Sequence, residues 1–156
     1  METLSTHKGS PVETLHLAPI VVGKLMSIGG MLQRHSNKLL QPYGLNQQQF
    51  SVFFEIANVG HVKQKEMINR LQLEKAHVSK VVKKLHAMGL ITMTPSTEDK
   101  RSAWLEVTPE GKELLEKVRA EFRASHEAWL EDIDATQLES VLDSLTLLQR
   151  VFGDKL

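Results

Sequence analysis

Residues 63–89 read KQKEMINRLQLEKAHVSKVVKKLHAMG, and the predicted fold rests on this segment. Its start predicts a short helix over residues 63–71, followed by the tight link Gln72-Leu73-Glu74. A second helix is predicted from Lys75 to Met88, because apolar residues recur at spacings of three and four. Gly89 follows as the residue after the C-cap. This order of elements predicts a helix-turn-helix. The residues expected to face inward in the second helix are Val78, Val81, Val82 and Leu85.

Two β-prone runs follow the helix-turn-helix. Residues 90–94 and 102–107 flank the polar turn 95–101, and Trp104 lies in the second run. Two short strands around a polar loop predict a β-hairpin, and a helix-turn-helix followed by a hairpin is a winged helix. Upstream, Asn46 is a favourable N-cap for one more helix of the same lobe. Its expected inner face is Phe50, Phe53, Phe54 and Ala57.

Long amphipathic helices are predicted at both ends of the chain. One occupies residues 15–42, after a loose tail over 1–14. Two more occupy residues 109–156, and Thr108 and Pro109 start the first of them. Their apolar positions include Ile20, Val21, Leu25, Ile28, Leu32 and Leu39, then Leu115, Val118, Phe122, Trp129 and Ile133, then Leu138, Val141, Leu142, Leu145, Leu148 and Phe152.

A small winged-helix lobe offers too little core to cover three such stripes. We therefore expect the terminal helices to pack on one another and on a second copy of the chain. The predicted fold class is mainly α with a small β-hairpin wing, within one domain over residues 15–156. A winged helix-turn-helix lobe (46–108) is joined to a helical dimerisation lobe (15–42 and 109–156).

The charge of the chain is zero overall and segregated along the sequence. Nineteen basic residues balance nineteen acidic ones. Residues 63–84 hold seven basic and two acidic side chains, whereas residues 109–156 hold six basic and eleven acidic ones. A local basic stripe on a neutral protein suggests that a polyanion docks at one place, although a solvated helix face has the same charge pattern.

The composition excludes several classes of protein. The chain has 156 residues and no cysteine, which removes disulfide scaffolds, cysteine-type zinc sites and thiol chemistry. Its N-terminus lacks the apolar core of a signal peptide, and no apolar run reaches the ~18 residues of a membrane span, so we expect a cytoplasmic protein. No nucleophile-elbow, phosphate-loop or metal-hydrolase motif is present, so neither an enzyme nor a cofactor is expected.

The second helix of a helix-turn-helix enters the major groove of DNA with its N-terminal residues at the base edges. Lys75, Ala76, His77 and Lys80 lie nearest that end and can contact bases through donors or, for alanine, the thymine methyl group. Ser79, Lys83 and Lys84 fit phosphate contacts better. We therefore predict double-stranded DNA as the partner.

The hairpin tip is the second candidate contact. It carries Asp99, Lys100 and Arg101. An arginine at this place can reach into a narrow minor groove, where the negative potential is deepest. Asp99 can hold the guanidinium in place by a charge-assisted pair.

These residues carry a resemblance to a known family. The patterns are Val78-Ser79-x-Val81-Val82-x-x-Leu85-x-x-x-Gly89-Leu90-Ile91, Pro95-x-x-x-Asp99-x-Arg101 and Val107-Thr108-x-x-Gly111. They resemble the MarR (multiple antibiotic resistance regulator) family over roughly residues 17–152. The resemblance implies a homodimeric winged-helix transcription factor that binds a short inverted repeat. Many members are repressors that a small aromatic or phenolic acid releases from DNA.

The resemblance also implies where such an effector would bind. By family position, Met31, Tyr43 and Phe54 are candidates. His35 lies in the apolar stripe of the first helix and is either a core or interface histidine or a polar group of the same cleft. Two alternatives stay open: a zinc-responsive regulator of the same fold, and a winged-helix module for protein–protein assembly.

Overall fold

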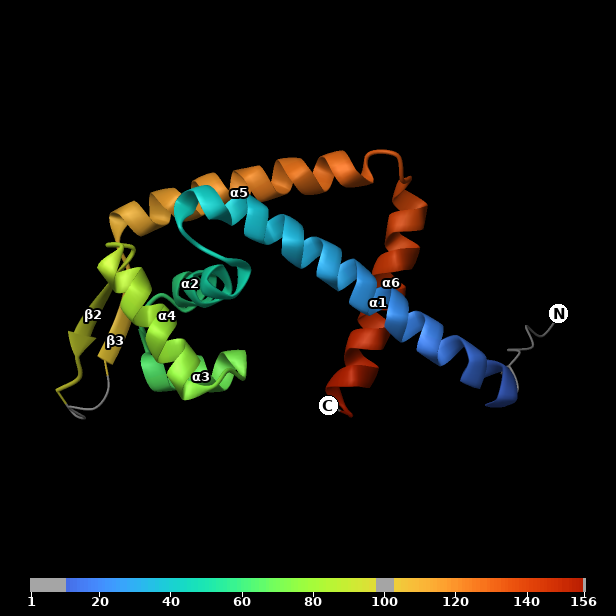
Figure 1. Cartoon of the computed structure of the whole chain (residues 1–156), viewed down its shortest axis with the longest axis horizontal. Helices are drawn as coiled ribbons and strands as arrows, with labels where there is room; N and C mark the ends of the chain where they lie inside the picture. Colours follow the sequence, from blue (N-terminus) through green and yellow to red (C-terminus); the bar gives the residue numbers. More distant parts are fainter. Residues whose placement is uncertain (1–10, 98–102, 156) are drawn as a thin grey trace, which may run out of the picture. The chain divides into compact units, whose positions relative to one another are not determined.

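The computed structural model describes residues 11–97 and 103–155, in two compact units that meet at Lys112 and Glu113. Helix α5 runs across the boundary between the two units. The first unit contains the sheet and the helices around it (Figure 1). In chain order, the elements are α1 (Pro11–Leu40), the 3-10 turn η1 (Gln41–Tyr43), α2 (Gln47–Val59), β1 (Val62–Lys63), α3 (Gln64–Leu71), α4 (Lys75–Ala87), β2 (Ile91–Pro95), β3 (Ala103–Val107), α5 (Pro109–Leu130) and α6 (Ala135–Gly153).

The sheet has one strand more than the sequence predicted. Its order is β1-β3-β2, and both pairings are antiparallel. The hairpin pairs Ile91 with Val107 and Pro95 with Ala103, so Pro95 belongs to a strand and not to the turn. Strand β1 pairs Val62 with Leu105. Two residues are too few for a strand to show alternation in the sequence, which is why β1 was missed.

Helices α2, α3 and α4 lie beside this sheet and enclose the core of the winged-helix lobe (Figure 1). Every element of the lobe contributes at least one side chain that is almost fully buried. This burial of apolar area is the main stabilising contribution to the lobe. The core residues include Val52, Phe53, Ile56, Val62, Met67, Val78, Val82, Leu85, Ile91 and Leu105.

The inner face of α2 differs from the predicted one. Asn46 caps the helix as expected, and its Oδ1 accepts from the backbone N–H of Gln49 at 2.9 Å. The buried residues, however, are Val52, Phe53 and Ile56, whereas Phe50 and Phe54 are half-buried. Two sets of apolar residues with helical spacing overlap in this segment. Of the predicted inner face, Phe53 is confirmed as buried, whereas Ala57, like Phe50 and Phe54, is half-buried.

Two predicted helix boundaries move. Helix α1 begins at Pro11 and not at residue 15, because proline is favourable at the first position of a helix. The remainder of the predicted tail, residues 1–10, lies outside the described residues. Helix α5 ends at Leu130, so Ile133 lies in the turn before α6 and not in the helical stripe. Asp134 caps α6 by accepting from the backbone N–H of Gln137 at 2.9 Å.

The terminal helices expose large apolar side chains. On α1 these include Leu17, Ile20, Val22, Met26, Ile28, Met31 and Leu32. On α6 they include Val141, Leu142, Leu145, Leu147 and Val151. In the part of the chain that the structure describes, no helix is both long and apolar enough to cross a bilayer.

Candidate nucleic-acid interface

Helix α4 has one buried and one open face. All four residues predicted to face inward, Val78, Val81, Val82 and Leu85, are buried. Ala76, Lys80 and Lys83 are exposed. Their i, i+4 and i+7 spacing places them on one stripe, opposite the core. We call these three residues the open stripe of α4, and two of its members carry an ammonium group.

Three further predicted contacts flank the open stripe. Lys75, the first residue of α4, is exposed, whereas His77 and Ser79 are half-buried. Ser79 Oγ accepts a hydrogen bond from Gln64 Nε2 at 2.7 Å, which ties α4 to α3. The hydroxyl can still donate its own proton, as a phosphate contact requires.

A shallow hollow lies beside the N-terminal end of α4, which we call the entering end because it is expected to enter the major groove. Gln48, Leu73, Glu74 and His77 line a space of about 200 Å³. His77 Nε2 is buried and has no hydrogen-bond partner among the described residues. Glu74 occupies the N-cap position without a side-chain cap hydrogen bond. A base contact by His77 through Nε2 therefore requires the ring to turn outward from this orientation.

Lys84 has different surroundings from the other lysines of α4. It is half-buried, and its Nζ donates to Gly44 O at 2.6 Å and to Gln49 Oε1 at 2.9 Å. Gly44 lies in the segment that joins α1 to α2, and Gln49 lies in the first turn of α2. The ammonium group thus bonds within the protein, although the sequence predicted a phosphate contact.

The basic stretch 63–84 likewise contains both cations that contact other side chains and cations that have no ion-pair partner among the described residues. Arg70 pairs with Glu55 at 3.4 Å, and Lys63 Nζ lies 4.8 Å from the ring centroid of Trp104. Four exposed lysines of the stretch have no ion-pair partner among the described residues: Lys65, Lys75, Lys80 and Lys83. They lie on α3 and α4, so the helix-turn-helix carries a cluster of uncompensated positive charge that can attract a polyanion.

The wing is described only at its base. Strands β2 and β3 pair as far as Pro95 and Ala103, so the two strands on either side of the hairpin tip are present. The predicted contacts Asp99, Lys100 and Arg101 lie outside the described residues.

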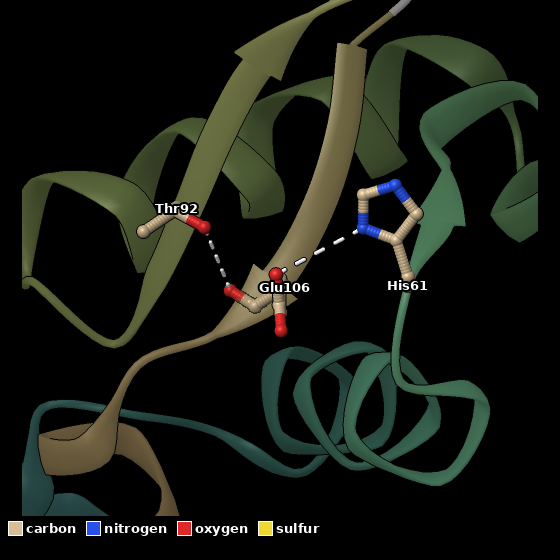
Figure 2. Close-up of polar contacts among 3 residues, drawn as sticks. All are labelled: His61, Thr92 and Glu106. Atoms are coloured by element: carbon tan, nitrogen blue, oxygen red, sulfur yellow. Dashed lines mark hydrogen bonds and ion pairs between the residues drawn. The ribbon is translucent and has the colours of Figure 1, made fainter.

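The outer face of the sheet carries a cluster that the sequence analysis missed. The His61 ring stacks on Trp104, with centroids 4.2 Å apart and planes 15° from parallel. His61 Nδ1 lies 3.9 Å from a carboxylate oxygen of Glu106, and Thr92 Oγ1 donates to the backbone oxygen of Glu106 at 3.4 Å (Figure 2). Trp104 therefore packs on the sheet surface and not in the core. Only the pairing of β1 with β3 brings His61 to it, and the sequence did not indicate that pairing.

The predicted effector residues come from three elements of the first unit. Met31 is 51% exposed on α1, and His35 lies half-buried one turn further along. Tyr43 of η1 and Phe54 of α2 are also half-buried. Within the described residues, no three histidine or carboxylate side chains gather as metal ligands would. An effector site among Met31, His35, Tyr43 and Phe54 stays a prediction.

Comparison with known sequences matches the winged-helix lobe to one family. A model of the MarR family matches residues 45–103. The HTH-type transcriptional regulator YwoH of Bacillus subtilis is 28% identical over 102 residues, covering 65% of this chain and 74% of the relative. The regulator YhbI of the same organism is 25% identical over 120 residues, covering 75% of this chain and 78% of the relative.

Solved structures share the fold over most of the chain. A MarR-family transcriptional regulator from Rhodococcus superposes with a TM-score of 0.69 at 27% identity, covering 84% of this chain and 94% of the other. A crystal structure of MarR gives a TM-score of 0.75 at 18% identity, covering 86% and 98%. The expected fold class, mainly α with a small winged β-sheet, is confirmed.

Proposed function

We propose that the chain is a winged-helix transcriptional regulator of the MarR family and that it acts as a homodimeric repressor of an inverted-repeat DNA site. As a member of a regulator family it is not an enzyme, as the sequence predicted. The observation that carries the proposal is the open stripe of α4. It lies opposite a fully packed face, at the position from which a helix-turn-helix reads DNA.

Base contacts are assigned to the entering end of α4 and phosphate contacts to its flanks. Lys75, Ala76, His77 and Lys80 meet the base edges in the major groove. Ser79 and Lys83 hold the phosphates and set the register. From the wing, Arg101 enters the minor groove, with Lys100 beside it and Asp99 as the partner of the guanidinium.

A second copy of the chain covers the apolar side chains that α1 and α6 expose. An inverted repeat needs two α4 helices about one turn of duplex apart, ~34 Å, and a two-fold symmetric dimer provides that arrangement. Its proposed place of action is the cytoplasm, where it would meet an operator.

A small aromatic or phenolic acid is the proposed effector, with Met31, His35, Tyr43 and Phe54 as its candidate contacts. It acts only through a difference in affinity for the DNA-bound and the released arrangement of the dimer. Zinc is the alternative effector. Thermal-shift screens with aromatic acids and with Zn²⁺ separate the two: the effector raises the melting temperature of the wild-type chain and lowers its affinity for DNA, whereas an inactive compound does neither.

The first experiment selects bound sites from a random duplex pool and then measures affinity for the selected site at several salt concentrations. We expect an inverted repeat and a steep fall of log K with log salt. Lys80→Ala lowers affinity. If Lys80 contacts a phosphate, the variant flattens the salt slope by about 0.9, and if Lys80 contacts a base, the variant relaxes the base preference at that position. Lys112→Ala, an exposed lysine of α5, serves as the control. A protein–protein assembly module would instead show no salt-dependent affinity for any duplex.

A further inference from the structure

Lys84 forms two internal hydrogen bonds across a long stretch of sequence. Its Nζ donates to Gly44 O at 2.6 Å and to Gln49 Oε1 at 2.9 Å, 40 and 35 residues away. Hydrogen bonds from a charged donor are about twice as strong as neutral ones. Lys83, its neighbour on the exposed side, has no such contact among the described residues.

The two acceptors belong to the junction between α1 and α2. Gly44 follows η1 in a left-handed conformation, with φ +69°, and its N–H donates to Gln41 O. Gln49 Oε1 also accepts from the backbone N–H of Asn46 at 3.1 Å, so it already belongs to the α2 capping box. One ammonium group therefore holds both the end of the turn and the start of α2.

The same junction is bonded to the body of α1. Asn37 Oδ1 of α1 accepts from the backbone N–H of Gln47 at 2.8 Å. Leu45 N–H donates to Leu40 O at 3.3 Å. A continuous set of hydrogen bonds thus runs from α1 through the turn and the α2 cap to Lys84 on α4.

We propose that Lys84 is a positioning residue: it holds helix α4 at a fixed orientation to the α1–α2 junction and does not contact DNA phosphate. This rests on the proposed function, since the affected ligand is duplex DNA. To reach a phosphate, Nζ would have to give up two short hydrogen bonds and leave two acceptors without their donor. A helix held in place before binding loses less conformational freedom when it enters the groove, so DNA affinity is higher.

The test compares Lys84→Met with Lys83→Met, its exposed neighbour. Affinity for the selected duplex is measured from low to high salt. The protein concentration of each variant is corrected for the fraction of protein that is active. We expect Lys84→Met to bind roughly three- to tenfold more weakly at every salt concentration, with an unchanged slope. Lys83→Met flattens the slope by about 0.9. A slope that flattens equally in Lys84→Met, or an affinity that stays at the wild-type value, would overturn the proposal.

Variants of Gln49 give a second readout that does not depend on DNA. Gln49→Glu keeps an acceptor for Lys84 and for the cap and should retain wild-type affinity, whereas Gln49→Met should not. In urea unfolding, the losses from Lys84→Met and Gln49→Met should be less than additive, because both remove the same hydrogen bond. If wild type bound no duplex, the proposed function would fail, and with it the role of Lys84 in DNA binding. The unfolding cycle would still report whether the Lys84–Gln49 bond forms, and strict additivity would contradict that bond.

Discussion

Thr108 connects three segments through one hydroxyl group. Its Oγ1 donates to Gly89 O at 2.7 Å and accepts from the backbone N–H of Gly111 at 3.0 Å. The first bond satisfies a carbonyl at the end of α4, and the second satisfies an N–H at the start of α5. Because both partners lie in the first unit, this side chain helps to fix the start of α5 relative to the end of α4.

Thr108→Val keeps the shape of the side chain and removes both bonds. We expect it to lower the free energy of unfolding by about 1–3 kcal/mol, since an N-cap is lost and a carbonyl loses its donor. Urea unfolding at equilibrium measures this change. Thr92→Val is the matched control, because Thr92 is exposed in β2 and its single bond is long at 3.4 Å. Equal losses in the two variants would contradict the capping role.

The predicted minor-groove contact of Arg101 can be tested by measuring DNA affinity. If its guanidinium enters the minor groove, Arg101→Ala weakens binding most where the flanks of the site are rich in A·T pairs, because the groove is narrow there. The measurement compares affinities for duplexes that differ only in their flanks. Equal affinity of variant and wild type for every flank would remove Arg101 from the interface.

Gly111 allows a close approach between the start of α5 and the base of the hairpin. A Cβ at this position would lie 2.2 Å from Leu90 O and 2.8 Å from a methyl carbon of Val107. The backbone oxygen belongs to the start of the hairpin and cannot move as a side chain does. Glycine is therefore required here by space, since no positive φ is recorded at this position.

Gly111→Ala should destabilise the lobe in spite of the better helix propensity of alanine. The propensity gain is about 1 kcal/mol, whereas forced overpacking against backbone typically costs about 1–3 kcal/mol or more. We expect a net loss in urea unfolding. Gly153→Ala is the control, because nothing lies within 4 Å of a Cβ there. A Gly111→Ala variant as stable as wild type would show that α5 can shift away from Leu90.

Much of this architecture could be predicted from local sequence patterns. The four inward residues of α4, the Asn46 cap and the start of α5 at Thr108 and Pro109 all depend on neighbours within one or two turns. Features that depend on distant partners were missed. Strand β1 exists only because β3 pairs with it, and the bonds of Lys84 join residues 35 and 40 positions apart. A run of lysines in the sequence therefore did not reveal which ammonium group is internal.

The exposed apolar side chains of α6 predict self-association of the chain. Leu142 is 64% exposed, so in the isolated chain it contributes little to the core. Leu142→Glu should leave the fold of one chain intact and weaken the dimer, because a charge at a buried interface is costly. Sedimentation at micromolar concentration measures the shift from dimer to monomer. Asp143→Lys, also exposed on α6, changes charge outside the apolar stripe and should leave the dimer unchanged.

The same variant tests whether dimerisation is what makes an inverted repeat a better site than a half-site. Two linked α4 helices gain effective concentration when the second half-site lies within reach, so the wild-type chain should bind a full repeat far more tightly than a half-site. A monomeric Leu142→Glu chain has no such linkage and should bind the two duplexes with similar affinity. Inserting about five base pairs between the half-sites should lower the wild-type affinity for the full repeat to that for a half-site, because the insertion turns one half-site to the opposite side of the duplex. A wild-type chain indifferent to both spacing and half-site number would show that each copy binds DNA independently.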